Sequence, residues 1–470
     1  MLTKTDYLDF LECPNEFWLK QNIERPKTEL SLGDRHRREQ GYDVEALARQ
    51  LTIFVAPEEG VVEFGKVFET EDLFAKADAV ITLPNGAIEI YEVKQNASIK
   101  RPKHIEDVSF QKHVAEALKF IVARVYLITV NTDYKLDGRL SPEECLTITD
   151  VTDEVLTCQA NIAERIQNAV SRRKAQPAID TTSYCKEKKL DCEFIRHYFT
   201  EIPEYNVSMI SRLNDDKLKE LLKRNILDIR NVPADFKLSD LQREQVTVAC
   251  SSEPSIKTAE IKDVLDGLKY PLHFLDYETF AYPLPQFQGI RAYQPLVFQY
   301  SMHTLKDRES EPDHAFCLAR NDGKFPSLEV AESLREALAD GVGTFIAWHA
   351  SFEKQRNTAL GEMHGEFADF FTEVNEKMFD LETIFTKKLY IDGRFLGKTS
   401  IKNVLPILCP QHSYKDLTIG DGDTASIRWY HMATGRGDAN NRNQIYEDLC
   451  NYCHLDTLAM VDIYRLLASL

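Results

Sequence analysis

The segment DAVITLPNGAIEIYEVK, residues 78–94, joins two apolar arms through a turn and ends both arms in charge. Pro84-Asn85-Gly86 fits a three-residue hairpin loop, with proline at the first turn position and glycine at the left-handed one. This loop predicts a register in which paired residue numbers sum to 170, so that Asp78 faces Glu92. A two-residue Asn-Gly loop, with a sum of 171, would turn Asp78 to the other face. Both loops predict a β-hairpin, but only the first brings the two acids together.

In the first register, side-chain alternation gives one hairpin face apolar residues near the turn and Asp78, Glu92 and Lys94 at the far end. Two opposed carboxylates repel each other unless a divalent cation lies between them. A nearby ammonium can stabilise the hydroxide that such a cation generates. The alternative is a surface hairpin whose last charges are solvated.

Asp78 followed by Glu92-Val93-Lys94 resembles the PD-(D/E)XK nuclease signature of RecB-like and CRISPR-associated DNA nucleases. Two flanking segments, YLDFLECPNEFWL (7–19) and DVSFQKHV (107–114), resemble the entry segment and the glutamine-motif helix of that family. The resemblance implies that Asp78 and Glu92 bind metal, that Lys94 is the catalytic lysine, and that Gln111 positions the substrate or the lysine. It implies a restriction-endonuclease-like core in residues 1–200.

Cysteines in the RecB-like relatives hold an iron–sulfur cluster that joins the two ends of the domain. Cys13, Cys185 and Cys192 match three of the four positions, and Tyr198 stands at the fourth. The missing cysteine favours loss of the cluster. An iron–sulfur cluster, a zinc ion and three buried free thiols remain the alternatives.

The net charge of −18 argues against a general surface for polyanions, because nucleic-acid affinity comes largely from neutralised phosphates. Binding can still be confined to a local basic groove, for which the candidates are Lys100, Arg101, Lys103 and Lys112. A solvated charged face is the alternative.

With 470 residues, 43% of them hydrophobic, the chain is expected to form two to four globular domains. The N-terminus lacks the pattern of a secretory leader, and no apolar run is long enough to span a bilayer. Ten cysteines without a disulfide framework fit reduced thiols. These features predict a cytoplasmic protein with no membrane partner. Polar helical periodicity predicts a helical connector over residues 201–257.

The segment YPLHFLDYETF reads as an apolar strand that places Asp276 and Glu278 on one face. It resembles the opening motif of the DEDD exonucleases, which have an RNase H-like fold and use two divalent metals. Glu353 falls in the first turn of a helix, where this family usually has Asp. Near the end of the chain, Tyr452 and Asp456 are four apart on a helix and match the tyrosine-type third motif.

This second resemblance covers residues 258–470 and implies that four acids bind metal while Tyr452 holds the attacking water. The acids are Asp276, Glu278, Glu353 and Asp456, and Asp380 fits a supporting position. The expected fold is therefore mixed α/β, with a PD-(D/E)XK core and an RNase H-like domain joined by a helical segment.

The predicted function is that of a DNA nuclease dependent on Mg²⁺ or Mn²⁺, with 3′–5′ exonuclease activity on single-stranded DNA, in repair or defence against foreign DNA. An RNA exonuclease that uses the RecB-like module as a binding clamp is the first alternative. The second is a non-catalytic scaffold for nucleic acid or a partner protein.

Overall fold

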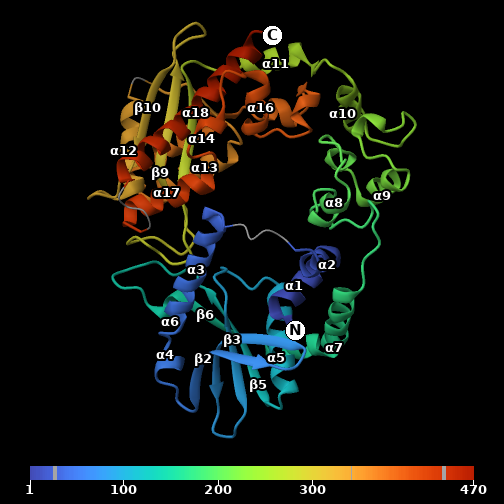
Figure 1. Cartoon of the computed structure of the whole chain (residues 1–470). Helices are drawn as coiled ribbons and strands as arrows, with labels where there is room; N and C mark the ends of the chain where they lie inside the picture. The colour runs from blue at the N-terminus through green and yellow to red at the C-terminus, as the bar shows by residue number, and fades with distance from the viewer. Residues whose placement is uncertain (25–28, 340, 437–440) are drawn as a thin grey trace. The chain divides into compact units, whose positions relative to one another are not determined.

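Figure 1 shows a computed structural model of the chain, which describes all residues except 25–28, 340 and 437–440. Two units separate in this structure. Unit 1 comprises Met1–Ile202 and Ala281–Gln294, and unit 2 comprises Pro203–Phe280 and Pro295–Leu470. The boundary at residue 202 lies close to the predicted one. The expected connector, residues 201–257, falls almost wholly in unit 2, and unit 1 also includes residues 281–294, which the sequence analysis assigned to the second domain.

The hairpin predicted over residues 78–94 forms in unit 1 from strands β3 (Leu73–Thr82) and β4 (Ile88–Val93). The pairs Val80–Ile90 and Thr82–Ile88 confirm the predicted register. Gly86 takes a φ of 83°, and its N–H donates to the Leu83 carbonyl at 2.9 Å, as the three-residue loop requires.

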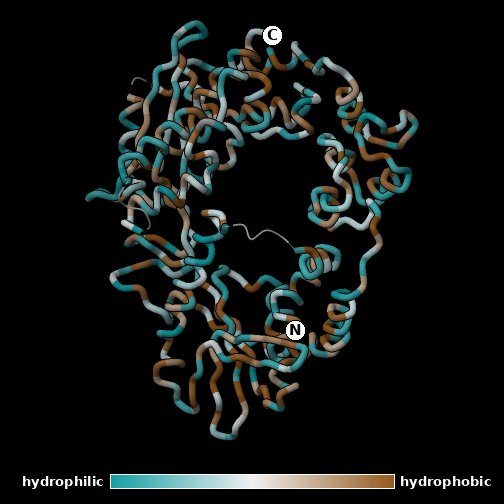
Figure 2. Tube along the Cα trace, viewed as in Figure 1, coloured by the Kyte–Doolittle hydropathy of each residue, from teal (hydrophilic) through white to brown (hydrophobic). Residues whose placement is uncertain are grey.

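The hairpin lies within a six-stranded mixed sheet of order β1-β3-β4-β5-β6, with β2 paired to β3. Helices α5 and α7 pack against each other, and both contribute to a core formed with the sheet. Figure 2 shows hydrophobic residues along the strands of this sheet. The other strands are β1 (Leu2–Thr3), β2 (Val61–Glu69), β5 (Val122–Val130) and β6 (Leu146–Asp150). The helices are α1 (Lys4–Glu12), α2 (Pro14–Asn22), α3 (Leu32–Ala48), α4 (Thr52–Val55), α5 (Lys103–Ala117), α6 (Pro142–Cys145), α7 (Thr152–Lys174) and α8 (Glu193–Tyr198).

Unit 2 has a five-stranded sheet of order β10-β9-β8-β11-β12. Strand β9 runs antiparallel to β8 and β10, whereas β11 is parallel to β8 and β12. The strands are β8 (Leu272–Phe280), β9 (Leu296–Leu305), β10 (Asp313–Leu318), β11 (Thr344–Ala347) and β12 (Met378–Asp380). A separate pair joins β7 (Ser255–Ile256) to β13 (Tyr390–Ile391).

Helices cover both faces of the unit 2 sheet. The side chains of β8 alternate between the two faces and therefore enter two different cores. Phe274 belongs to a core with α16 and α18, whereas Leu275 belongs to a core with α12, α13 and α14. The helices of unit 2 are α9 (Asp215–Lys223), α10 (Asp240–Cys250), α11 (Thr258–Asp266), α12 (Pro326–Ala337), α13 (Ser351–Met363), α14 (Ala368–Glu376), α15 (Thr383–Thr386), α16 (Ile401–Leu408), α17 (Gly422–Thr434) and α18 (Arg442–Ala468). Short 3₁₀ turns are η1 (Val207–Met209), η2 (Ile229–Asn231), η3 (Gly365–Phe367), η4 (Gly393–Phe395) and η5 (Tyr414–Asp416).

The protein thus has mixed α/β architecture in both units. No helix in the described part of the chain combines the length and the apolar character needed to cross a membrane.

Candidate functional site

The acid cluster of unit 2 is built on strand β8. Leu272 and Phe274 bury their side chains in the core beneath α18, and alternation places Asp276 and Glu278 on the same face. The sequence prediction that these two acids share a face is therefore confirmed.

Two helices bring further acids near Asp276 and Glu278. Asp456 lies on α18, and its carboxylate, together with those of Asp276 and Glu278, offers three oxygens that all lie within 4.8 Å of one another. Glu353 lies in the first turn of α13, as predicted, and its charge raises the pKa of Asp276 and Glu278. We call Asp276, Glu278, Glu353 and Asp456 the acid cluster.

Burial and mutual repulsion dominate the electrostatics of the acid cluster. Both effects hold the pKa of Asp276 and of Glu278 well above their usual values. Burial raises the pKa of Glu353 to about 8 and that of Asp456 to about 6. The Glu353 Oε2 atom is buried and has no hydrogen-bond partner in the described structure. Four carboxyl groups, of which Asp276 is half-buried and the other three are buried, have the donor chemistry of a hard-cation site, and they fit Mg²⁺ or Mn²⁺.

Tyrosines and a lysine border the acid cluster. Tyr452 lies one helical turn before Asp456, and the two hydroxyls of Tyr414 and Tyr452 hydrogen-bond the Asp456 carboxylate and oppose the rise in its pKa. The Tyr414 Oη–Asp456 Oδ1 distance is 2.5 Å. Burial and the Asp456 charge raise the pKa of both phenols, so each stays protonated and able to donate.

Lys402, on α16, lies 5.5 Å from the centre of the Tyr452 ring, and its Nζ donates to the Gly420 carbonyl at 2.8 Å. Its positive charge lowers the pKa of Glu278 and Asp456. The side chain is exposed, so it can meet a ligand from solvent. Sequence reasoning missed Lys402 and Tyr414, which lie outside the three motifs.

Asp380 ends β12 and accepts hydrogen bonds from the backbone N–H groups of His349 and Glu382, at 3.1 and 3.0 Å. It therefore shapes the loop before α13, which agrees with a supporting position.

The second candidate site lies at the charged end of the hairpin in unit 1. Asp78 and Glu92 follow the confirmed register, and the Asp78 Oδ2 accepts the Val93 N–H at 2.7 Å. Burial and the charge of Glu92 raise the pKa of Asp78 to about 7. Helix α5 brings Gln111 to the same place, where its Nε2 donates to Glu92 Oε2 at 2.8 Å.

Two lysines neutralise the carboxylates at this site. Lys94 Nζ lies 2.8 Å from Glu92 Oε1 and 2.6 Å from Asp107 Oδ2. Lys4 Nζ lies 2.6 Å from the same Glu92 oxygen and 3.2 Å from Asp107 Oδ1. We call these four residues the lysine–carboxylate network. Although burial opposes the charge of each lysine, the two carboxylates outweigh it and raise both lysine pKa values.

Lys4 reaches the network because Thr3 pairs with β3 and caps α1 in a capping box with Asp6, so that the helix starts with Lys4 next to the hairpin. Sequence reasoning found Asp78, Glu92, Lys94 and Gln111, which the structure brings together, but it missed Lys4 and Asp107. Metal binding by Asp78 and Glu92 stays a prediction. The network already satisfies Glu92 with two ammonium groups and an amide, so a cation there would have to compete with Lys4.

The three cysteines Cys13, Cys185 and Cys192 are all buried in unit 1. A hydrogen bond from the Cys13 thiol lowers the pKa of Cys192 to about 6, so these two sulfurs are neighbours. All ten cysteines are free thiols. Among the described residues, the three cysteines are not one of the groups whose ligand atoms lie close enough together to hold a metal ion. Tyr198 packs its ring on Phe194, with 5.0 Å between centroids. Loss of the cluster, which the missing cysteine favours, stays a prediction.

The four basic residues expected to line a groove are mostly paired. Arg101 Nε lies 2.6 Å from Glu154 Oε2, and Lys103 Nζ lies 3.2 Å from Glu12 Oε2. Lys112 is buried and pairs with Glu116, while Lys100 is exposed. A phosphate-binding groove remains a prediction, and these pairs weaken it.

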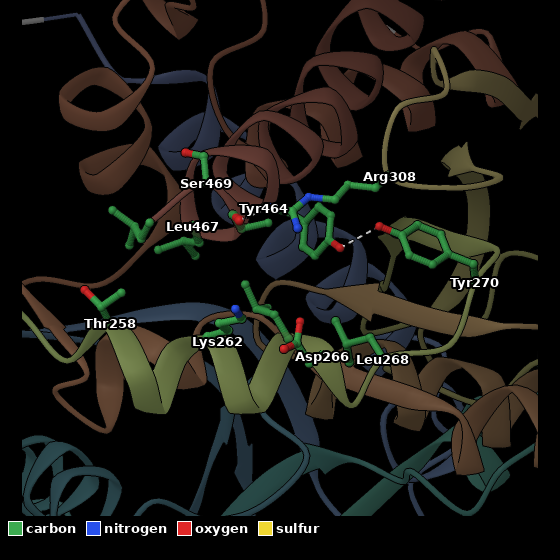
Figure 3. Close-up of a pocket in the computed structure, with 12 residues that line it drawn as sticks. Thr258, Lys262, Asp266, Leu268, Tyr270, Arg308, Tyr464, Leu467 and Ser469 are labelled. Carbon is green, nitrogen blue, oxygen red and sulfur yellow. Dashed lines mark hydrogen bonds between the residues drawn. The ribbon is translucent and has the colours of Figure 1, made fainter.

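A pocket of about 390 Å³ lies between α11 and the C-terminal end of α18 (Figure 3). The hydroxyls of Tyr270 and Tyr464 hydrogen-bond there at 2.8 Å, near Lys262, Asp266 and Arg308. No member of the acid cluster lines this pocket, so it is separate from the site described above.

Residues 273–400 match a protein family described as a domain of unknown function, DUF2779. The matched range contains three members of the acid cluster but ends before Asp456. No curated protein matches the chain. Among solved structures, the crystal structure of SSO0001 aligns with 13% identity over 41% of this chain and 84% of that one. Its TM-score is 0.24, which does not establish a shared fold.

Proposed function

We propose that the protein is a metal-dependent phosphodiesterase whose working site is the acid cluster of unit 2, acting as a 3′–5′ exonuclease on single-stranded DNA. The observation that carries the proposal is the convergence of the Asp276, Glu278 and Asp456 carboxylate oxygens within 4.8 Å. Divalent ions held by these carboxylates and Glu353 would supply the Lewis acidity for phosphodiester hydrolysis.

The contrast between the two sites supports this choice. The lysine–carboxylate network sets two ammonium groups against Glu92 and Asp107. The acid cluster gathers four carboxyl groups, and the cation that acts on Glu278 and Asp456 is the exposed Lys402. With less positive charge of the protein beside them, the carboxyl groups of the acid cluster are better able to take up divalent cations, which favours unit 2 as the catalytic unit.

The surrounding residues suit a phosphate ester. The protonated phenol of Tyr452 can donate to an attacking water or to a phosphate oxygen, and Lys402 can pair with the phosphate charge. The strand order of the unit 2 sheet, with its second strand antiparallel to the rest, is the order expected of an RNase H-like fold, and it supports the proposed kinship with DEDD exonucleases.

An RNA exonuclease in which unit 1 serves as a clamp is the second candidate. The Lys4–Glu92 ion pair favours the clamp, because a carboxylate already paired is a poorer metal ligand.

The test is digestion of 5′-labelled single-stranded DNA and of RNA of the same sequence, with Mg²⁺ or Mn²⁺. We expect the DNA to shorten from its 3′ end, and we expect Glu278→Gln to reduce the rate by at least about a hundredfold. Glu447→Gln, an exposed acid on α18, is the matched control and should retain the wild-type rate.

The Glu92→Gln variant shows which of the two units holds the working site. Loss of cleavage in Glu92→Gln alone would move the working site to unit 1. Cleavage of RNA alone would support the second candidate function. If neither the DNA nor the RNA is cleaved, the enzymatic proposal is refuted in favour of a scaffold.

A further inference from the structure

Three histidines that the acid cluster does not use lie together in unit 2. His303 is on β9, His314 on β10 and His454 on α18. One ring nitrogen of each lies within 4.8 Å of a ring nitrogen of both others. We call these residues the histidine cluster.

The topology of the sheet assembles the histidine cluster. His303 and His314 are directly paired across the antiparallel β9–β10 ladder, so their rings stack with 4.3 Å between centroids. Helix α18 packs on β9 and brings the His454 ring edge-on to both, at 4.7 and 4.5 Å. Three imidazoles therefore converge from two strands that follow each other in the chain and from a helix near its end.

Hydroxyl groups hydrogen-bond one nitrogen of two of the rings and so fix the orientation of these rings. Thr457 Oγ1 hydrogen-bonds Nδ1 of His303 at 2.8 Å, and Ser301 Oγ hydrogen-bonds Nε2 of His314 at 2.9 Å. The two hydroxyls are themselves 2.8 Å apart. This arrangement leaves Nε2 of His303 and Nδ1 of His314 for a ligand, in the way that outer-shell groups orient metal-binding histidines.

We propose that the histidine cluster binds a divalent transition metal ion, Zn²⁺ foremost, through one nitrogen of each imidazole. Three nitrogen donors suit borderline-soft ions and differ in kind from the carboxylate oxygens of the acid cluster. His303 is buried, whereas His314 is exposed, so the site has a protein wall on one side and solvent for a fourth ligand on the other.

The protonation state of the rings agrees with metal binding. Burial and the neighbouring imidazoles lower the pKa of His303 to about 3 and that of His314 to about 4. Both rings are therefore neutral at pH 7, which is the form that donates a lone pair to a metal.

A metal ion at this site would tie the β9–β10 edge of the sheet to α18. The same helix carries Tyr452 and Asp456, so the ion would hold in place the element that completes the acid cluster. Its role would be structural, and the binding would not depend on nuclease activity.

Cobalt(II) titration of the metal-free, reduced protein tests the proposal, because Co²⁺ on imidazole nitrogens in a four- or five-coordinate site absorbs in the visible. Octahedral carboxylate sites absorb only weakly there, and thiolates add charge-transfer bands in the near ultraviolet. We expect a visible band that saturates at one equivalent, shows no thiolate band and disappears when Zn²⁺ is added.

His314→Gln is the decisive variant because the side chain is exposed and its loss should leave the fold intact, as circular dichroism can check. It should weaken Co²⁺ binding by about tenfold or more. His364→Gln is the matched control, since that histidine is also held by a serine hydroxyl, Ser327 Oγ at 2.9 Å, and it should bind as the wild type does. Glu278→Gln should keep the band as well.

The proposal is overturned if the wild type gives no visible band, or if His314→Gln binds Co²⁺ as tightly as the wild type. The cluster would then be a set of packed neutral imidazoles. Failure of the nuclease assay would leave this result unaffected, because the readout is the spectrum of the bound ion.

Discussion

Replacement of Asp456 by asparagine should stabilise the metal-free protein at alkaline pH. Asp456 is buried among other acids, and its pKa in the folded protein is about 6, against 3.8 for an ordinary aspartate. The native state therefore binds more protons than the unfolded state between these values, and the free energy of unfolding falls as pH rises through them. One pKa unit corresponds to about 1.4 kcal/mol, so the ionised carboxylate costs about 3 kcal/mol above pH 7.

Asparagine removes this cost, and its amide oxygen can still accept the Tyr414 hydrogen bond. In urea unfolding with a chelator present, Asp456→Asn should be more stable than the wild type by about 3 kcal/mol at pH 8 and by about half as much at pH 5. Glu447→Gln on the exposed side of α18 should change little at either pH.

Addition of Mn²⁺ should reverse the order, because the ion stabilises the folded wild type and binds the variant less tightly. The reasoning is refuted if Asp456→Asn is less stable than the wild type at pH 8 in chelator. It is refuted too if the advantage of the variant grows as pH falls.

Three further predictions concern single residues. Gly86→Ala should lower the free energy of unfolding by about 1 kcal/mol, since the φ of 83° strains any side chain although nothing crowds the site; an unchanged urea midpoint would contradict this. Lys4→Met should lower the free energy of unfolding by about 3–5 kcal/mol, because it leaves Glu92 and Asp107 short of one positive charge. A stability within about 1 kcal/mol of the wild type, which is the usual scatter of surface variants, would argue against the network. Lys402→Ala should raise KM for DNA more than it lowers kcat and should reduce the salt dependence of KM, whereas an equal loss in kcat and kcat/KM would place the lysine in transition-state chemistry.

Local chemistry explains what the sequence could predict. The Pro-Asn-Gly loop determines the register of β3 and β4, so the meeting of Asp78 and Glu92 follows from a few residues. The period of two along β8 likewise fixes the side on which Asp276 and Glu278 lie. Each prediction needs one element and its geometry, and the structure agrees with both.

Tertiary contacts explain what the sequence could not predict. Lys4 contacts Glu92 across 88 residues of chain, and nothing in the periodicity of either segment couples them. Tyr414 follows α16 in a short 3₁₀ turn, which has no pattern of its own. Lys112 reads as a surface charge, yet α5 is buried on nearly all sides and pairs it with Glu116. In each case the packing of whole helices and strands brings the charged group or hydroxyl next to its partner, and the local sequence does not encode this packing.

The composition of unit 1 has a consequence for biosynthesis. Residues 281–294 belong to this unit, and Gln288 exchanges two hydrogen bonds of 2.8 Å with the backbone of Gly138. A ribosome makes this segment only after strand β8 of unit 2, so unit 1 is incomplete while its first 202 residues emerge. Gene truncation near residue 200 would therefore yield an N-terminal fragment without the partners of Gly138, and a cut at any single point of the chain cannot release both units whole.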